Sequence, residues 1–186
     1  MSNLISHNAR QTIDHMVLRA IKASPLLGMD VVRSIEVQSD LARLTSEQAV
    51  VLTVSSYVFR LTFMIHFSQD DITRAHFAGL NRVAASDLND QEYLDAVREC
   101  GNVCCGNLNR DLVRFFPHVG MSTPNIIDRR CVAYLDKLGE GYVQHFVLMD
   151  AAGPPFAVTV CVNAFAELDF VGDFADAEET GELEMF

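Results

Sequence analysis

A carboxylate and a carboxamide stand three residues apart near the middle of this chain, at Glu99 and Asn102. If the segment is helical, residues at this spacing are neighbours on one face. A carboxamide can accept a hydrogen bond from water and donate another, so it can orient an attacking water. A carboxylate can instead hold a cationic group of a partner. Such a pair is suited to completing the active site of another protein, as in phosphoryl hydrolysis, where positioning and charge neutralisation provide most of the catalysis.

The spacing of apolar and small residues predicts that 91–116 is a helix. The predicted buried stripe consists of Leu94, Val97, Gly101, Cys104, Leu108, Leu112 and Phe115. The opposite, exposed face consists of Asp95, Glu99, Asn102, Gly106 and Arg110. Glycine is unfavourable inside a helix, so both glycines call for a reason. Gly101 on the buried stripe permits close packing, and Gly106 on the exposed face leaves room for an approaching molecule. The alternative is a solvated helix face with two tolerated glycines.

The run from Glu99 to Leu108, ECGNVCCGNL, resembles the E-x-G-N-x-x-x-G-x-L helix of the CheC/CheX phosphatases of bacterial chemotaxis. A hairpin and a helix precede it over 50–85. A segment resembling the family's P-P-T-V stretch follows at 122–127. The resemblance covers residues 7–165. The chain departs from the family pattern at Cys100, Cys104 and Cys105, and at Asn125 in the later segment.

This resemblance implies a hydrolase that removes the phosphoryl group from the aspartyl-phosphate of a CheY-like response regulator. Asn102 would orient the hydrolytic water, and Glu99 would contact a lysine of the regulator. Asp95, Gly106 and Arg110 on the same face are expected to contact the partner. The chain would need no cofactor of its own, because the phosphorylated regulator would supply the Mg²⁺. A single polar pair per chain is the CheX-like pattern, which also implies a homodimer.

Two other functions stay open at this point. A fold-level resemblance guarantees no chemistry, so the chain could be a catalytically silent module that binds a response regulator or serves for dimerisation. The cysteines at 100, 104 and 105 could instead sense redox state or bind a metal. We expect no metal site, because no flanking histidine or cysteine completes a ligand set and buried thiols commonly act as small hydrophobic groups.

Composition narrows the class of protein. The chain has 186 residues, 49% hydrophobic and 21% charged, which is ordinary for a globular domain. A net charge of −11 argues against a nucleic-acid-binding surface. No apolar run is long enough to span a bilayer, and the first residues lack the pattern of a secretory signal. We therefore expect a cytoplasmic protein that is not bound to a membrane.

We predict one α+β domain at 1–166, with long helices packed on an antiparallel or mixed sheet. Helices are expected at 7–23 and 69–84, the second capped by Ser68. Strands are expected at 31–37, 121–127 and 130–135, and in two hairpins, 49–54 with 58–67 and 142–149 with 156–163.

Two halves of the domain, 7–85 and 89–165, are similar enough in their order of elements to suggest an internal duplication. In such a duplication, His7 and Arg10 stand where the second half has Glu99 and Asn102, which leaves one polar pair rather than two. Residues 167–186 include eight acidic residues and no basic ones, and they are expected to form a flexible tail.

Overall fold

The computed structural model describes residues 4–27, 34–41, 44, 46–138, 141–149 and 156–172. The elements in chain order are α1 (His7–Lys22), η1 (Pro25–Leu27), β1 (Ser34–Gln38), β2 (Gln48–Ser55), β3 (Phe59–Phe67), α2 (Asp71–Leu80), η2 (Ala85–Asp87), α3 (Asp90–Leu112), β4 (Gly120–Met121), β5 (Asn125–Asp128), η3 (Arg129–Leu138), β6 (Tyr142–Met149) and β7 (Phe156–Ala164). Both hairpins and α1 lie within one residue of the predicted bounds, whereas α3 ends at Leu112, four residues before the predicted end at 116. The predicted α+β class is confirmed.

One seven-stranded sheet forms the centre of the fold, in the order β1-β6-β7-β3-β2-β4, with β5 also paired to β2. Every pair of named strands in it is antiparallel. The order β1-β6-β7-β3-β2-β5 is symmetric between the two halves of the chain. If β1, β2 and β3 are exchanged with β5, β6 and β7, the same order results, read from the opposite edge of the sheet. The predicted duplication would produce this symmetry, although the duplication itself stays a prediction.

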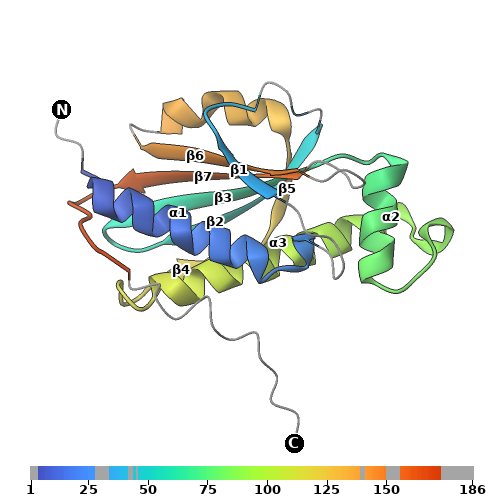
Figure 1. The fold of residues 1–186 in the computed structure, drawn as a ribbon, viewed down its shortest axis with the longest axis horizontal. Coiled ribbons are helices and arrows are strands. Elements are labelled where there is room, and N and C mark those ends of the chain that lie inside the picture. The colour runs from blue at the N-terminus through green and yellow to red at the C-terminus, as the bar shows by residue number, and fades with distance from the viewer. Residues whose placement is uncertain are drawn as a thin grey trace, which may run out of the picture.

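The sheet is covered on both faces. Helices α1 and α3 run alongside each other on one face (Figure 1), where alternate residues of β2, including Val50, Leu52 and Val54, point into the main core. On the opposite face, Ala49, Met64 and Cys161 pack with Val132 of η3. Among the described residues, no helix combines the length and the apolar character that crossing a membrane requires.

Several predicted elements need correction. The predicted strand 121–127 is observed as two short strands, β4 and β5, with 122–124 between them. Helix α2 is shorter than the predicted 69–84, and its N-cap is Asp70 rather than Ser68, because the Asp70 carboxylate accepts the backbone N–H of Thr73 at 2.8 Å. At its other end Arg82 has a left-handed φ of 57°, which a continuing helix cannot accommodate.

The segment 130–135 is not extended but belongs to the 3₁₀ helix η3. The Asp128 carboxylate accepts the backbone N–H of Arg130 at 2.8 Å, a local turn that competes with continued strand pairing. The adjacent Arg129 guanidinium donates to the carbonyls of Leu41 and Leu44 and fixes the start of η3. The first predicted strand, 31–37, is observed as β1 from Ser34 onward, and 31–33 lie outside the described residues.

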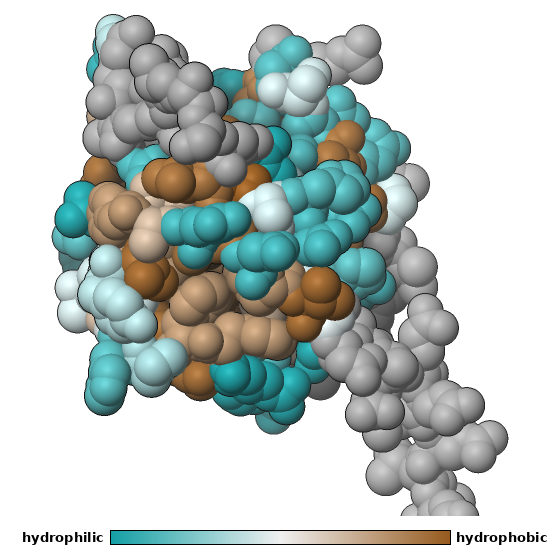
Figure 2. All heavy atoms as spheres, turned by 90° about the vertical axis from the view of Figure 1, so that its left-hand side faces the viewer, coloured by the Kyte–Doolittle hydropathy of each residue, from teal (hydrophilic) through white to brown (hydrophobic). Residues whose placement is uncertain are grey.

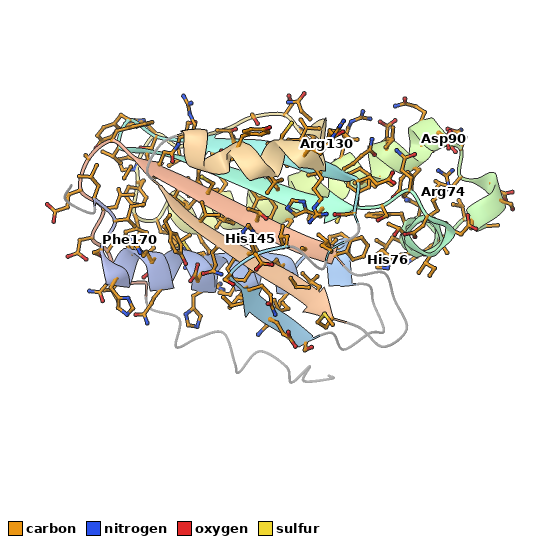
Figure 3. The ribbon with its side chains drawn as sticks, turned by 90° about the horizontal axis from the view of Figure 1, so that it is seen from above. Arg74, His76, Asp90, Arg130, His145 and Phe170 are labelled. Atoms are coloured by element: carbon orange, nitrogen blue, oxygen red, sulfur yellow. The ribbon has the colours of Figure 1, made fainter. Side chains whose placement is uncertain are left out.

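Residues 167–172 pack on the domain, so the predicted start of the tail at 167 is wrong. Leu168 is buried and exchanges backbone hydrogen bonds with Leu4 and Ser6. The ring of Phe170 lies 5.1 Å from that of Phe115 and 5.0 Å from that of Phe116. Figure 2 looks directly at this end of the molecule and shows hydrophobic residues gathered there. Phe170 is labelled at the same end in Figure 3. Residues 173–186 lie outside the described residues.

Leu168→Ala is expected to lower the free energy of unfolding by about 2–5 kcal/mol, the usual effect of truncating a buried leucine side chain to alanine. Leu168 is 2% exposed, whereas the neighbouring Glu167 is exposed. Chemical denaturation of Leu168→Ala beside Glu167→Ala measures the difference. Equal stability of the two variants would contradict the packing of this segment.

Candidate functional site

Helix α3 begins with a complete capping box, which fixes its first turn. The Asn89 side chain accepts the backbone N–H of Glu92 at 3.0 Å, and the Glu92 carboxylate accepts the backbone N–H of Asn89 at 3.1 Å. Asp90 and Glu92 in the first turn also suit the positive end of the helix dipole. The helix therefore begins at Asp90, one residue before the predicted start.

The buried stripe of α3 holds the helix against β2. Val97, Gly101, Cys104, Leu108 and Leu112 are buried, as the spacing predicts. A Cβ on Gly101 would lie 2.6 Å from Cγ1 of Val50, so only glycine permits this close contact. The stripe seats α3 on the sheet and directs its opposite face outward.

Glu99, Asn102 and Gly106 lie on that outward face. Glu99 is exposed, and Asn102 and Gly106 are partly exposed. Apart from the adjacent backbone of α3 itself, no atom lies within 4 Å of a Cβ built on Gly106, so the face is open at this point. No hydrogen bond or ion pair of the described residues includes the side chain of Glu99 or Asn102. Both polar groups are therefore available to a partner, and the helix that carries them is firmly packed.

The other two predicted contact residues are engaged within α3. The Asp95 carboxylate pairs with Arg98 at 2.7 Å and accepts a hydrogen bond from Gln91 at 2.9 Å. Arg110 donates to the Asn107 side chain at 3.1 Å. Both are exposed on the predicted face, so they can contact a partner only by sharing or exchanging these neighbours.

The three cysteines of α3 belong to the main hydrophobic core. Cys100, Cys104 and Cys105 are buried, and burial raises the pKa of each thiol, to about 12 for Cys104 and Cys105. A protonated thiol is a poor nucleophile and a poor metal ligand. Within the described part of the chain, no cluster of three or more histidine, cysteine or acidic side chains is arranged to hold a metal. These thiols pack in the main hydrophobic core, the environment in which a cysteine acts as a small hydrophobic group.

A pair of histidines lies on the other side of the sheet, away from α3. The Thr159 hydroxyl is 2.8 Å from Nε2 of His66 and 2.8 Å from Nδ1 of His145. Burial, together with the charge of Arg129, lowers the pKa of His66 to about 3. A neutral, fully buried histidine here is a structural group of the core and takes no part in the α3 face.

One feature of the site was not predicted from the sequence. An open groove of about 500 Å³ adjoins Glu99 between α3 and the segment after α2. It is lined by Asn81, Val83, Asp87, Leu88, Glu92, Asp95, Ala96 and Glu99. Half of these residues precede α3 in the chain, and no local pattern indicates that they lie beside Glu99.

Comparison with known proteins finds similarity in structure but not in sequence. No family model matches the chain, and no curated protein does. CheX in the CheX–CheY–BeF3–Mg²⁺ complex from Borrelia burgdorferi aligns with a TM-score of 0.61 and 12% identity, over 83% of this chain and 97% of that one. A CheC-like superfamily protein from Shewanella sp. PV-4 aligns with a TM-score of 0.59 and 11% identity, over 86% and 99%.

CheX from Vibrio vulnificus aligns similarly, with a TM-score of 0.58 and 12% identity, over 82% of this chain and 97% of that one. In all three alignments nearly the whole of the known structure is matched, so the similarity extends over a complete domain. The chain therefore has the fold of the CheC-like and CheX chemotaxis proteins.

Proposed function

We propose that this chain is a phosphatase that hydrolyses the aspartyl-phosphate of a CheY-like response regulator. The observation that carries the proposal is the outward face of α3, where Glu99 and Asn102 stand side by side without partners among the described residues. The fold supports it, because one protein of the same fold is a CheX found in complex with CheY, BeF3 and Mg²⁺.

In this mechanism Asn102 positions the attacking water. Its carboxamide oxygen accepts a hydrogen bond from the water and its NH₂ group donates one, so the water is held in a fixed orientation toward phosphorus. The regulator supplies the phosphoaspartate and the Mg²⁺ that neutralises the phosphoryl oxygens. The chain thus contributes orientation, which the regulator alone lacks.

Glu99 binds and orients the regulator. Its carboxylate is one helical turn before Asn102 and accepts a charge-assisted hydrogen bond from a lysine ammonium beside the phosphorylation site. Gly106, one turn beyond Asn102, leaves the face open for the regulator to approach closely. The CheX-like pattern also implies a homodimer, which sedimentation of the purified chain would test.

The experiment that tests the proposal follows the decay of a phosphorylated CheY-like regulator of the same organism. The chain is expected to speed the decay above the spontaneous rate, and the acceleration is expected to saturate as the chain is added. A regulator that binds but decays at its spontaneous rate would make the chain a binding module instead.

Glu99→Ala is expected to weaken binding of the phosphorylated regulator about 10- to 100-fold, because a close charge pair is lost. Glu99→Gln keeps an acceptor without the charge and is expected to fall between Glu99→Ala and the wild type. The measurement is the concentration of regulator at half-maximal decay rate. Glu36→Ala removes an exposed carboxylate on β1 and is the matched control. Half-maximal concentrations equal to that of the control would contradict the role of Glu99.

A further inference from the structure

The groove beside Glu99 combines an apolar floor with an acidic rim. Val83, Leu88 and Ala96 supply the apolar part, and Val83 is 43% exposed although it is a large hydrophobic residue. The carboxylates of Asp87, Glu92, Asp95 and Glu99 stand around them. Figure 1 shows this region at the end of the molecule where α2 and the following loop meet the start of α3.

Few of these charges are neutralised within the described residues. Asp95 pairs with Arg98. Glu92 accepts the Asn89 backbone N–H, and Asp87 accepts the Ser86 hydroxyl, and both of these donors are neutral.

The arginine of α2 has other partners, because Arg74 donates to the Asp90 carboxylate at 2.9 Å and to the carbonyl of Leu88 at 2.7 Å. Figure 3 labels Arg74 and Asp90 at this end of the molecule. Arg82 is exposed next to Val83 but does not line the groove. The groove therefore keeps an excess of negative charge around an exposed apolar surface.

We propose that this groove binds a cationic, partly apolar segment of the same response regulator, beside its phosphorylation site. The inference rests on the proposed function, because Glu99 belongs both to the groove and to the α3 face. A regulator docked at Asn102 and Glu99 would extend over the adjacent groove. A basic segment with an apolar side chain matches both the rim and the floor, and opposite charge also speeds encounter at low ionic strength.

Asp87→Lys tests the charge of the rim. Asp87 belongs to η2, and the only hydrogen bond to its side chain among the described residues comes from the Ser86 hydroxyl. We expect affinity for a BeF3-activated regulator to fall about fivefold or more at low salt, and the salt dependence of affinity to weaken. The matched control is Glu167→Lys, which changes the net charge equally at an exposed position outside the groove. Equal affinities of the two variants would overturn the inference.

Val83→Ser tests the apolar floor separately. We expect a few-fold loss of affinity that persists at high salt, because burial of apolar surface is not screened. Exposed Val113→Ser at the end of α3 is the control, and equal affinities would again count against the groove. Thermal unfolding of each variant checks that the fold is intact.

These binding measurements separate the inference from the proposed function. Binding of a BeF3-activated regulator requires no hydrolysis, so a chain that binds without accelerating decay refutes the phosphatase and leaves the groove result standing. Accelerated decay with normal binding by both groove variants refutes the groove alone. A wild-type chain that does not bind the regulator refutes both.

Discussion

Asn102→Ala is expected to lower the maximal rate of regulator dephosphorylation about 10²- to 10³-fold, or to the spontaneous rate if that is reached first, because one positioned hydrogen-bonding group contributes on this scale. The substitution removes the group that orients the water, but it leaves Glu99 and the open surface at Gly106 in place. Binding of a BeF3-activated regulator is therefore expected to change only a few-fold. The loss should appear in the maximal rate rather than in the concentration of regulator at half-maximal rate.

Asn107→Ala is the matched control for this variant. Asn107 is on the same helix, but its side chain donates to the Ala23 carbonyl at 3.3 Å and accepts from Arg110, so it has a structural role. Asn107→Ala is expected to keep most of the activity. Full activity of Asn102→Ala would contradict the water-orienting role. A large loss of regulator binding in this variant would indicate that Asn102 contributes to binding rather than to the chemical step.

Gly106→Leu is expected to reduce dephosphorylation about 100-fold, because it moves the regulator away from Asn102 and small misplacements have effects of this size. Helical side chains lean toward the preceding turn, so a leucine here would extend over Asn102. Apart from the adjacent backbone of α3, no atom lies within 4 Å of the new Cβ, so the substitution displaces no packed neighbour at that position. Replacing a helical glycine is expected to raise stability by about 0.5–1 kcal/mol.

Two further variants make this prediction specific. Gly79 in α2 is also open within 4 Å, so Gly79→Leu makes the same change away from the site and is expected to keep full activity. Gly106→Ala adds only a methyl group and is expected to keep activity within a few-fold. Wild-type activity in Gly106→Leu would contradict close approach of the regulator at this surface.

The two glycines of α3 show what the sequence could predict. Their positions on the helical stripe assign Gly101 to the interior and Gly106 to the outer face, and the structure places both accordingly. Strong local patterns also locate the two hairpins and α1 to within a few residues. The exposed face with Glu99 and Asn102 follows from the same periodicity.

Non-local contacts account for what the sequence could not predict. Leu168 is buried because it bridges to Ile5 at the other end of the chain, and nothing in the acidic segment around it indicates this. The groove likewise depends on a non-local arrangement, because Val83 and Asp87 precede α3 in the chain but line the groove together with residues of α3. Within η3, the turn at Asp128 and Arg130 overrides the extended pattern of the following residues.

Catalytic turnover of the phosphorylated regulator is the most direct test of the phosphatase. The measurement is the phosphate released when the wild-type chain is present at one-tenth or less of the concentration of a phosphorylated CheY-like regulator. We expect release of several phosphates per chain above the spontaneous background, at a rate that saturates with regulator. Release at the spontaneous rate, while the regulator demonstrably binds the chain, would contradict the account.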